Sequence, residues 1–278
     1  MRRHKFDSLN NLQQRAITAL IGVSIILSAV LYSDFTFMLL FCTISAMTQL
    51  EFYKLLGLDG NQPLKTYGTV CGVLLIILAY LIEKNIISAE NYFIICPLLT
   101  MIYFIKLYKR NDLKPFMNIA FTFLGVIYVA LPFSLMVVLA LREGFYNYEI
   151  VLGSLLLLWA SDIGGYFAGS RYGKRKLFLR ISPKKSWEGA IGGAVFAGIV
   201  AFFLGMYFNT FHPWEWYCIG AIIVVAGTYG DLVESLFKRS ISIKDSGNSI
   251  PGHGGFLDRF DGLLLASPFI ITFLKLFS

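Results

Sequence analysis

Apolar residues occupy most of this chain in long uncharged runs, which short polar segments separate. A helix needs about 20 apolar residues to cross the hydrocarbon core of a bilayer. Lipid offers the backbone no hydrogen-bond partners, so a run of this length is expected to be a helix. The pattern predicts an all-α, polytopic transmembrane helical bundle of about nine spans. These spans are residues 16–33, 35–50, 67–83, 91–107, 116–141, 149–169, 188–208, 214–230 and 261–277.

Two of these spans carry irregularities. The fifth contains Pro132, and proline removes a backbone hydrogen bond and clashes with the preceding turn, so we expect a kink there or a helix end just after it. The eighth contains Glu215, which shortens its apolar stretch. No internal repeat or long linker divides the chain. We therefore expect one integral membrane domain over 1–278, with N-terminal spans in 1–150 and the polar stretches described below in 151–278.

Lysine and arginine gather in alternate loops. If the N-terminus is inside, only Lys84, Arg142 and Lys275 of the 24 basic residues fall on the outer side. Cytoplasmic loops of membrane proteins carry such an excess of positive charge. The distribution predicts a cytoplasmic N-terminus and an outer C-terminus.

Composition excludes an ordinary soluble domain. Hydrophobic residues make up 56% of the chain and charged residues 15%, whereas a soluble domain has about 25% charged residues. The net charge of +7 is mostly the orientation signal, so it requires no nucleic acid as partner. A basic inner face would also attract anionic lipid headgroups and nucleotides.

The first unusual polar stretch covers residues 161–189. Asp162 lies within a helical run, and an intramembrane carboxylate is a functional candidate because its burial is costly. Alternatively, Asp162 lies at the water interface and pairs with a nearby arginine. The glycines beside it have spacings typical of close helix packing. They are Gly164, Gly165 and Gly169.

The same stretch ends in SPKKSWEG, which combines a turn at Ser182–Pro183, the adjacent Lys184 and Lys185, and a helix start near Trp187. A helix N-terminus beside lysines binds anions well, because free N–H groups and the helix dipole add to the ammonium charge. A plain cytoplasmic loop would explain two lysines equally well. Composition leaves both interpretations open.

The second polar stretch covers residues 230–262. If a helix continues through Asp231, then Asp231, Glu234, Ser235 and Lys238 lie on one face of it. Such a face binds a hard cation through carboxylate oxygens and a phosphate through lysine.

A glycine-rich turn, PGHGG at 251–255, follows, and its backbone N–H groups could approach phosphate closely. Asp258, Arg259 and Asp261 then open the last helix. Taken singly, the aspartates fit a helix cap and His253 fits a turn. Together, carboxylates, cations and glycines suit Mg²⁺-dependent phosphoryl or nucleotidyl transfer. The chain has no P-loop, HExxH, GxSxG or CxxC motif, so a serine or zinc hydrolase is unsupported.

At these residues the chain resembles the phosphatidate cytidylyltransferases, also called CDP-diacylglycerol synthases. Their C-terminal motif joins K-R, K-D, H-G-G and D-R-[hydrophobic]-D elements at fixed spacing. Residues 235–261 match it at every specified position and read SLFKRSISIKDSGNSIPGHGGFLDRFD. The SPKKSWEG stretch and residues 161–169 also resemble the family, whereas the first 150 residues agree only in hydropathy and size.

The resemblance implies that CTP and phosphatidic acid react to give CDP-diacylglycerol and pyrophosphate, with Mg²⁺ as cofactor. It also implies that the enzyme lies in the bilayer as a homodimer. It implies Asp231 and Asp258 as metal ligands, with Asp261 close by. It also implies that Lys238, Arg239, Lys244 and Arg259 contact phosphates. Together with the residues singled out above, the resemblance gives an expected catalytic set of Asp231, Asp258, Asp261, Lys238, Lys244, Arg259 and His253. The expected substrate-binding set is Lys184, Lys185, Ser182, Arg239, Gly254, Gly255 and Asp162.

Several alternatives stay open. The sequence does not decide whether a second, monovalent cation joins Mg²⁺, or whether the enzyme is a CTP-dependent lipid kinase or a cytidylyltransferase for another lipid phosphate. A transporter using Asp162 as a coupling carboxylate would often show inverted repeats, and the hydropathy shows none. The short basic N-terminus and compact length fit a bacterial inner membrane, with the catalytic spans and loops of 151–278 facing the cytoplasm.

Overall fold

The computed structural model describes residues 11–277, except 143, 244–246, 248–249 and 251–253. Its α-helices are α1 (Asn11–Tyr32), α2 (Asp34–Leu58), α3 (Lys65–Glu83), α4 (Ile95–Leu107), α5 (Pro115–Gly125), α6 (Leu131–Ala140), α7 (Tyr148–Tyr172), α8 (Trp187–Tyr207), α9 (Pro213–Ser240) and α10 (Leu257–Phe277). A 3-10 helix, η2 (Ala89–Ile94), precedes α4, and a π-helical turn, η3 (Val126–Ala130), joins α5 to α6. The strands form two antiparallel hairpins, β1 (Leu141–Arg142) with β2 (Phe145–Tyr146) and β3 (Lys176–Phe178) with β4 (Ser182–Ser186).

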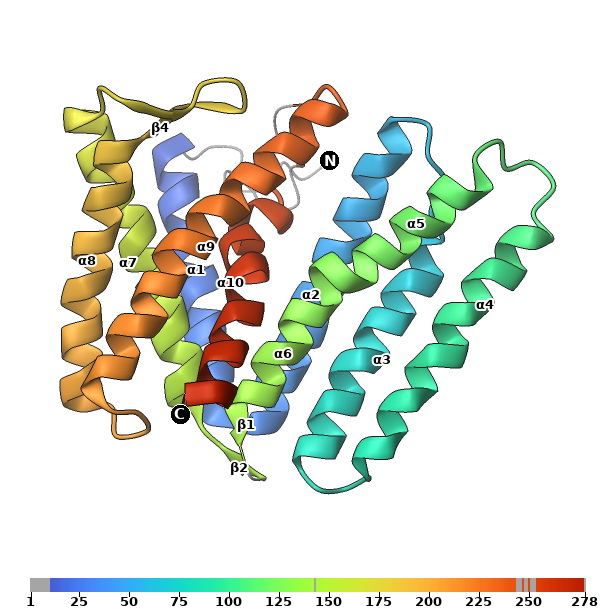
Figure 1. The fold of residues 1–278 in the computed structure, drawn as a ribbon, viewed down its shortest axis with the longest axis horizontal. Helices are drawn as coiled ribbons and strands as arrows, with labels where there is room; N and C mark the ends of the chain where they lie inside the picture. Colours follow the sequence, from blue (N-terminus) through green and yellow to red (C-terminus); the bar gives the residue numbers. More distant parts are fainter. Residues whose placement is uncertain (1–10, 143, 244–246, 248–249, 251–253, 278) are drawn as a thin grey trace, which may run out of the picture.

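The helices form two groups that lie side by side (Figure 1). Helices α7, α8, α9 and α10 pack on one another and form the C-terminal group, and helices α2 to α6 form the N-terminal group. Helix α10 joins the groups because it also packs against α6 and α2. Aromatic rings fill this junction: Phe133 of α6 lies edge-on to Phe41 of α2 and to Phe260 of α10, with ring centroids 5.6 and 5.7 Å apart.

The predicted polytopic helical bundle is confirmed. Within the described part of the chain, eight helical segments are long and apolar enough to cross a membrane, with η2–α4 and α5–α6 each counted as one. The first predicted span differs, since its apolar part, Ala16–Tyr32, is shorter than the other eight. The count of nine spans and the cytoplasmic N-terminus therefore stay predictions.

Of the two irregular spans, the fifth behaves as its sequence suggests and the eighth does not. The fifth span changes to the π-helical turn just before Pro132, which lies in the first turn of α6. Proline has no N–H to donate, and a local π turn lets the backbone groups that it leaves unpaired find other partners. Helix α9 extends beyond the predicted eighth span to Ser240, so the predicted continuation of this helix through Asp231 is confirmed. Glu215 does not shorten it: the Glu215 carboxylate accepts the N–H of His212 at 2.6 Å and so caps the start of α9.

The β3–β4 hairpin corrects the all-α prediction locally. The turn predicted at Ser182–Pro183 is wrong, because both residues lie in β4 and the turn covers 179–181. The predicted helix start is confirmed, since α8 begins at Trp187. Ser186 caps it, with its Oγ accepting the N–H of Gly189 at 3.2 Å. The hairpin therefore holds its lysines beside a capped helix N-terminus.

Small residues bring the helices of the C-terminal group close together. A Cβ added at Gly164 of α7 would lie 2.5 Å from the carbonyl oxygen of Gly192 in α8, so the predicted close packing at Gly164 is confirmed. A Cβ added at Gly230 of α9 would lie 2.4 Å from the carbonyl oxygen of Asp261 in α10. Glycine at 230 therefore lets the two helices that hold the acidic residues approach closely.

The loops divide between the two ends of the bundle. Figure 1 shows the β3–β4 hairpin, the α2–α3 and α4–α5 connections and the C-terminal end of α9 at one end. The β1–β2 hairpin and the α8–α9 connection lie at the other end. The segments at the first end are those in which the sequence concentrates its lysines and arginines.

Candidate active site

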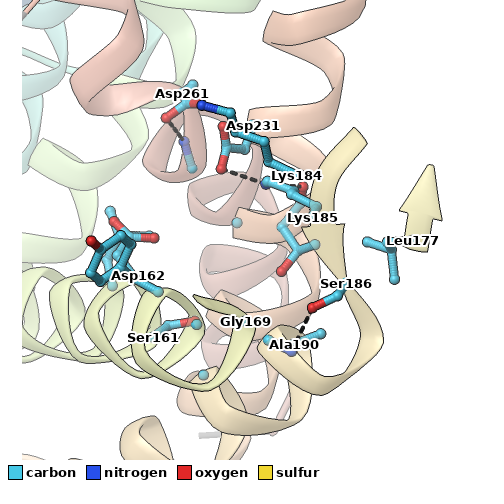
Figure 2. Close-up of a pocket in the computed structure, with 18 of the residues that line it drawn as sticks. Ser161, Asp162, Gly169, Leu177, Lys184, Lys185, Ser186, Ala190, Asp231 and Asp261 are labelled. Atoms are coloured by element: carbon cyan, nitrogen blue, oxygen red, sulfur yellow. Dashed lines mark hydrogen bonds and ion pairs between the residues drawn. The ribbon is translucent and has the colours of Figure 1, made fainter. Parts of the chain in front are cut away.

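A cavity of about 760 Å³ lies among α7, α8, α9, α10 and the β3–β4 hairpin (Figure 2). Part of its lining is apolar and comes from Leu158, Trp159 and Ile223. The charged part comes from Asp162, Lys176, Lys184, Lys185, Asp231, Asp258, Arg259 and Asp261. Glycines of all four helices line much of the remainder, which leaves backbone accessible to a bound molecule.

Three carboxylates form what we call the acidic cluster: Asp231, Glu234 and Asp261. One oxygen of each lies within 4.8 Å of the others. Asp231 and Glu234 come from successive turns of α9, and Asp261 comes from the start of α10. Glu234 is 1% exposed and Asp261 is 9% exposed. Like charges held this closely and this deeply repel one another unless a cation is present.

The protein's own cations balance the acidic cluster only in part. Lys185 pairs with Asp231, and Lys238 pairs with Glu234. The second oxygen of Glu234, Oε1, is buried and has no hydrogen-bond partner among the described residues. The Oδ1 atom of Asp261 accepts the N–H of Gly262 at 2.8 Å, and no lysine or arginine in the described ranges forms an ion pair with Asp261.

Asp258 lines the same cavity but lies outside the acidic cluster. Its Oδ1 accepts a hydrogen bond from Lys238 Nζ at 2.7 Å, and its Oδ2 accepts one from the Gly255 N–H at 3.2 Å. Lys238 thus bridges α9 and α10. The sequence predicted Asp231 and Asp258 as the metal ligands; the structure groups Asp231 with Glu234 and Asp261, and the choice of ligands stays a prediction.

The two predicted polar stretches meet in this cavity. Lys184 and Lys185 reach it from β4, and Lys185 also donates to the carbonyl oxygen of Thr228 in α9 at 3.3 Å. Figure 2 shows both lysines beside Asp231, with Asp162 lower on the α7 side. The alternative that Asp162 pairs with an arginine finds no ion pair within the described residues. Arg259 is exposed and lines the cavity.

The other predicted substrate-binding residues are not among those that line the cavity. Ser182 begins β4, and the exposed Arg239 donates to the carbonyl oxygen of Ile243 at 3.1 Å. Gly254 has φ +85°, a conformation that favours glycine, and Gly255 binds Asp258 through its N–H. Lys244 and His253 lie outside the described residues.

Sequence reasoning missed two acidic residues. Glu234 was placed on the correct helix face by its spacing but was not chosen as a site residue. Glu51 of α2 was not predicted either, although a carboxylate inside an apolar run is itself a sign of a functional residue. Both Glu51 oxygens accept backbone N–H groups at the start of α10.

The acidic cluster fits a divalent cation. Its donors are carboxylate oxygens, the ligands that hard cations such as Mg²⁺ prefer. The buried, unpaired Glu234 Oε1 is an oxygen that such an ion would satisfy. Asp231, Glu234 and Asp261 are therefore the residues of the described chain best suited to hold a metal.

Comparison with known proteins identifies the family of this chain. The family model described as "Cytidylyltransferase family" matches residues 13–277. The chain is 33% identical to the phosphatidate cytidylyltransferase of Haemophilus influenzae, over 94% of this chain and 98% of that protein. It is 31% identical to the phosphatidate cytidylyltransferase of Bacillus subtilis, over 96% of this chain and 99% of that protein. The protein of the same name from Staphylococcus aureus is 32% identical, over 92% of this chain and 96% of its own length. The chain belongs to the cytidylyltransferase family of membrane enzymes.

Proposed function

We propose that this enzyme transfers CMP from CTP to phosphatidic acid, giving CDP-diacylglycerol and pyrophosphate. The observation that supports it best is the cavity, which joins an acidic cluster and lysines to an apolar wall within a bundle of candidate membrane spans. The names of the relatives support the same substrates.

The proposed reaction needs no covalent enzyme intermediate. The phosphate monoester of the lipid has a second pKa of about 6, so it is largely a dianion at neutral pH and serves as the nucleophile. One of its oxygens attacks the α-phosphorus of CTP, and the bond between the α-phosphorus and the bridging oxygen to the β-phosphate breaks. Pyrophosphate leaves with that oxygen. No proton must be removed from the attacking group.

The main obstacle to this reaction is electrostatic, because two polyanions must meet. We propose that Lys184 and Lys185 on β4 bind phosphate oxygens in the cavity, together with Arg259 on α10, which also lines it. Lys238 keeps Asp258 in place and is expected to stabilise negative charge through the same ammonium group. Each of these cations reduces the repulsion that both substrates experience as they approach.

We propose that Asp231, Glu234 and Asp261 hold Mg²⁺. A bound divalent cation neutralises phosphate charge and polarises the phosphoryl group under attack. The residues themselves keep their carboxylates converged because α9 and α10 approach closely at Gly230. Whether a monovalent cation binds as well is decided by comparing activity in potassium and in choline salts.

The apolar part of the cavity suits an amphiphilic acceptor. Leu158, Trp159 and Ile223 lie on the membrane-spanning parts of α7 and α9, and the charged lining lies nearer the hairpin end. We propose that acyl chains contact the apolar wall and that the lipid phosphate reaches the lysines. The bacterial plasma membrane, a site facing the cytoplasm and a homodimer complete the proposal.

The experiment is a substrate panel with purified protein in detergent micelles and Mg²⁺. CTP, dCTP, ATP and UTP are each offered with phosphatidic acid, and CTP is also offered with diacylglycerol and with other lipid phosphates. The proposal predicts CDP-lipid and pyrophosphate from CTP and phosphatidic acid. CDP as a product would indicate a lipid kinase instead. Absence of CDP-diacylglycerol from folded, metal-supplied protein would overturn the proposed function.

A further inference from the structure

The acidic residue Glu51 of α2 reaches the start of the helix that carries Asp258 and Asp261. It lies in α2, is 6% exposed and is separated from α10 by about 200 positions in the sequence. Its Oε2 accepts the N–H of Phe256 at 3.0 Å, and its Oε1 accepts the N–H of Leu257 at 3.3 Å. Both oxygens of one carboxylate therefore bind adjacent backbone groups.

Helix α10 requires such a partner from elsewhere. The first N–H groups of a helix have no acceptor within the helix, and a polar side chain just before it usually supplies one. The residue before α10 is Phe256, whose side chain has no acceptor. Glu51 supplies the acceptors from a different helix, and its charge suits the positive end of the helix dipole.

The neighbour of Glu51 contacts the other acidic helix. Phe52 is 1% exposed, and its ring lies 5.0 Å from the ring of Phe237 in α9, measured between centroids. Phe237 directly precedes Lys238, which binds both Glu234 and Asp258. Adjacent residues of α2 thus contact both helices that form the acidic cluster.

We infer that Glu51 is a positioning residue for the active site, one that fixes the first turn of α10 so that Asp258 and Asp261 face α9 correctly. This inference rests on the proposed function for its catalytic readout. A carboxylate that binds two adjacent N–H groups restricts both the rotation of the first turn of α10 about the helix axis and its position along that axis. A buried carboxylate that only stabilised the fold would leave metal binding unchanged.

The chain offers a control in Glu149 of α7. Its carboxylate also accepts two adjacent backbone N–H groups, those of Asn209 and Thr210 at 3.1 and 3.0 Å, but both bind one oxygen, Oε2. These groups belong to the α8–α9 connection, at the end of the bundle away from the β3–β4 hairpin (Figure 1). Glu149→Gln therefore removes the charge of a carboxylate that binds backbone N–H groups, far from the acidic cluster.

The test compares Glu51→Gln with Glu149→Gln in the full-length protein. A glutamine retains one acceptor oxygen but presents its NH₂ group to the second N–H. Hydrogen–deuterium exchange of the peptide over 254–262 is measured first, then Mn²⁺ affinity by electron paramagnetic resonance of free Mn²⁺, then kcat and the half-saturating Mg²⁺ concentration. Outer partners that orient metal ligands typically affect affinity or activity about 10–100-fold.

For Glu51→Gln we expect faster exchange in that peptide, Mn²⁺ affinity reduced about tenfold and kcat reduced about tenfold or more. We expect Glu149→Gln to retain wild-type values of all three. Glu51→Asp, which keeps the charge but shortens the side chain, tests the same direction if Glu51→Gln does not fold. Mn²⁺ affinity and kcat within about twofold of the control would overturn the inference. If the wild type makes no CDP-lipid, the proposed function fails, and the exchange and Mn²⁺ measurements still decide the role of Glu51.

Discussion

Two polar clusters, one in each helix group, differ in how completely their charges are balanced. In the N-terminal group, Lys106 of α4 pairs with Asp112, and their side chains are 0% and 1% exposed. Asp112 also accepts hydrogen bonds from Asn118 Nδ2 at 2.6 Å and from the Lys114 N–H at 3.1 Å. Lys106 Nζ also donates to the carbonyl oxygen of Gln62, so the cluster ties the α2–α3 and α4–α5 connections together.

The acidic cluster of the C-terminal group has the opposite character. It brings three carboxylates together, leaves Glu234 Oε1 without a partner among the described residues and borders a cavity. Burial of charge alone therefore does not distinguish a functional site from a structural one. The distinction lies in the balance: a satisfied buried pair holds loops in place, and an unsatisfied acidic set calls for a ligand.

The largest expected effect concerns the acidic cluster. Asp231→Asn and Asp261→Asn should each reduce CMP transfer by on the order of 10³-fold, because each removes a charged ligand from the proposed metal site. The melting temperature of Asp261→Asn should stay equal or rise, because one repelling charge is gone. Transfer rates and thermal unfolding of the same preparations check both expectations. Full activity in both variants would refute the metal assignment.

The second prediction concerns the balanced pair. Lys106→Met leaves Asp112 buried without its cation and should destabilise the protein by about 3–5 kcal/mol. The kcat of the molecules that remain folded should not change. Denaturant unfolding in detergent measures the stability. Adding Asp112→Asn to this variant should recover much of the loss, since asparagine keeps an acceptor for Asn118. A stability within about 1 kcal/mol of wild type for Lys106→Met would show that the pair is not structural.

A smaller effect is expected at the wall of the cavity. Lys185→Gln removes the ammonium group that pairs with Asp231 and is proposed to bind phosphate. The KM for CTP should rise about tenfold, because a charge-assisted hydrogen bond is lost. Lys109→Gln, on the exposed end of the α4–α5 connection, is the matched control and should leave KM unchanged. Equal KM values for CTP in the two variants would show that Lys185 does not bind CTP.

The smallest effect is the pH dependence of stability that the Lys106–Asp112 pair contributes. Burial would raise the pKa of Asp112, but hydrogen bonds from Lys106, the Lys114 N–H and Asn118, with the charge of Lys106, together lower that pKa below its usual 3.8. Asp112 therefore stabilises the fold fully above its unfolded-state pKa, and this contribution is lost as the pH falls through the lower folded-state pKa.

Thermal unfolding of the wild type and of Asp112→Asn between pH 7 and pH 3 measures this contribution. The stability gap between them should be constant above about pH 5 and shrink as the pH falls below 3.8. A gap that widens on acidification would mean that the pKa of Asp112 is raised.

Much of the fold could be predicted from the sequence because a bilayer imposes length and apolarity on each span. The helix ends were harder, since polar residues such as Glu215 and Asp231 lie within α9 rather than beyond it. The β3–β4 hairpin was missed because its strands are short and rich in lysine, with no alternating apolar pattern. Its backbone pairing depends on the neighbouring start of α8, which no local pattern encodes.

The candidate site was predictable where its residues are close in sequence. Asp231, Glu234 and Lys238 lie on one face because of helical spacing alone, and Asp258 and Asp261 follow from the same rule. The close approach of α9 and α10 could not be predicted from the sequence, because it depends on Gly230 contacting the backbone of Asp261. Glu51 could not be placed at all, because its contact with Phe256 and Leu257 exists only once the two helix groups have packed.

The most direct test of the difference between the two clusters is one side-by-side transfer assay. Wild type, Asp261→Asn and Lys106→Met receive phosphatidic acid, Mg²⁺ and CTP labelled at the α-phosphate, and label in the lipid phase is divided by the amount of folded protein. We predict equal transfer by wild type and Lys106→Met, and almost none by Asp261→Asn. Transfer that survives in Asp261→Asn, or disappears in folded Lys106→Met, would contradict the assignment of the unbalanced cluster to chemistry and the balanced one to structure.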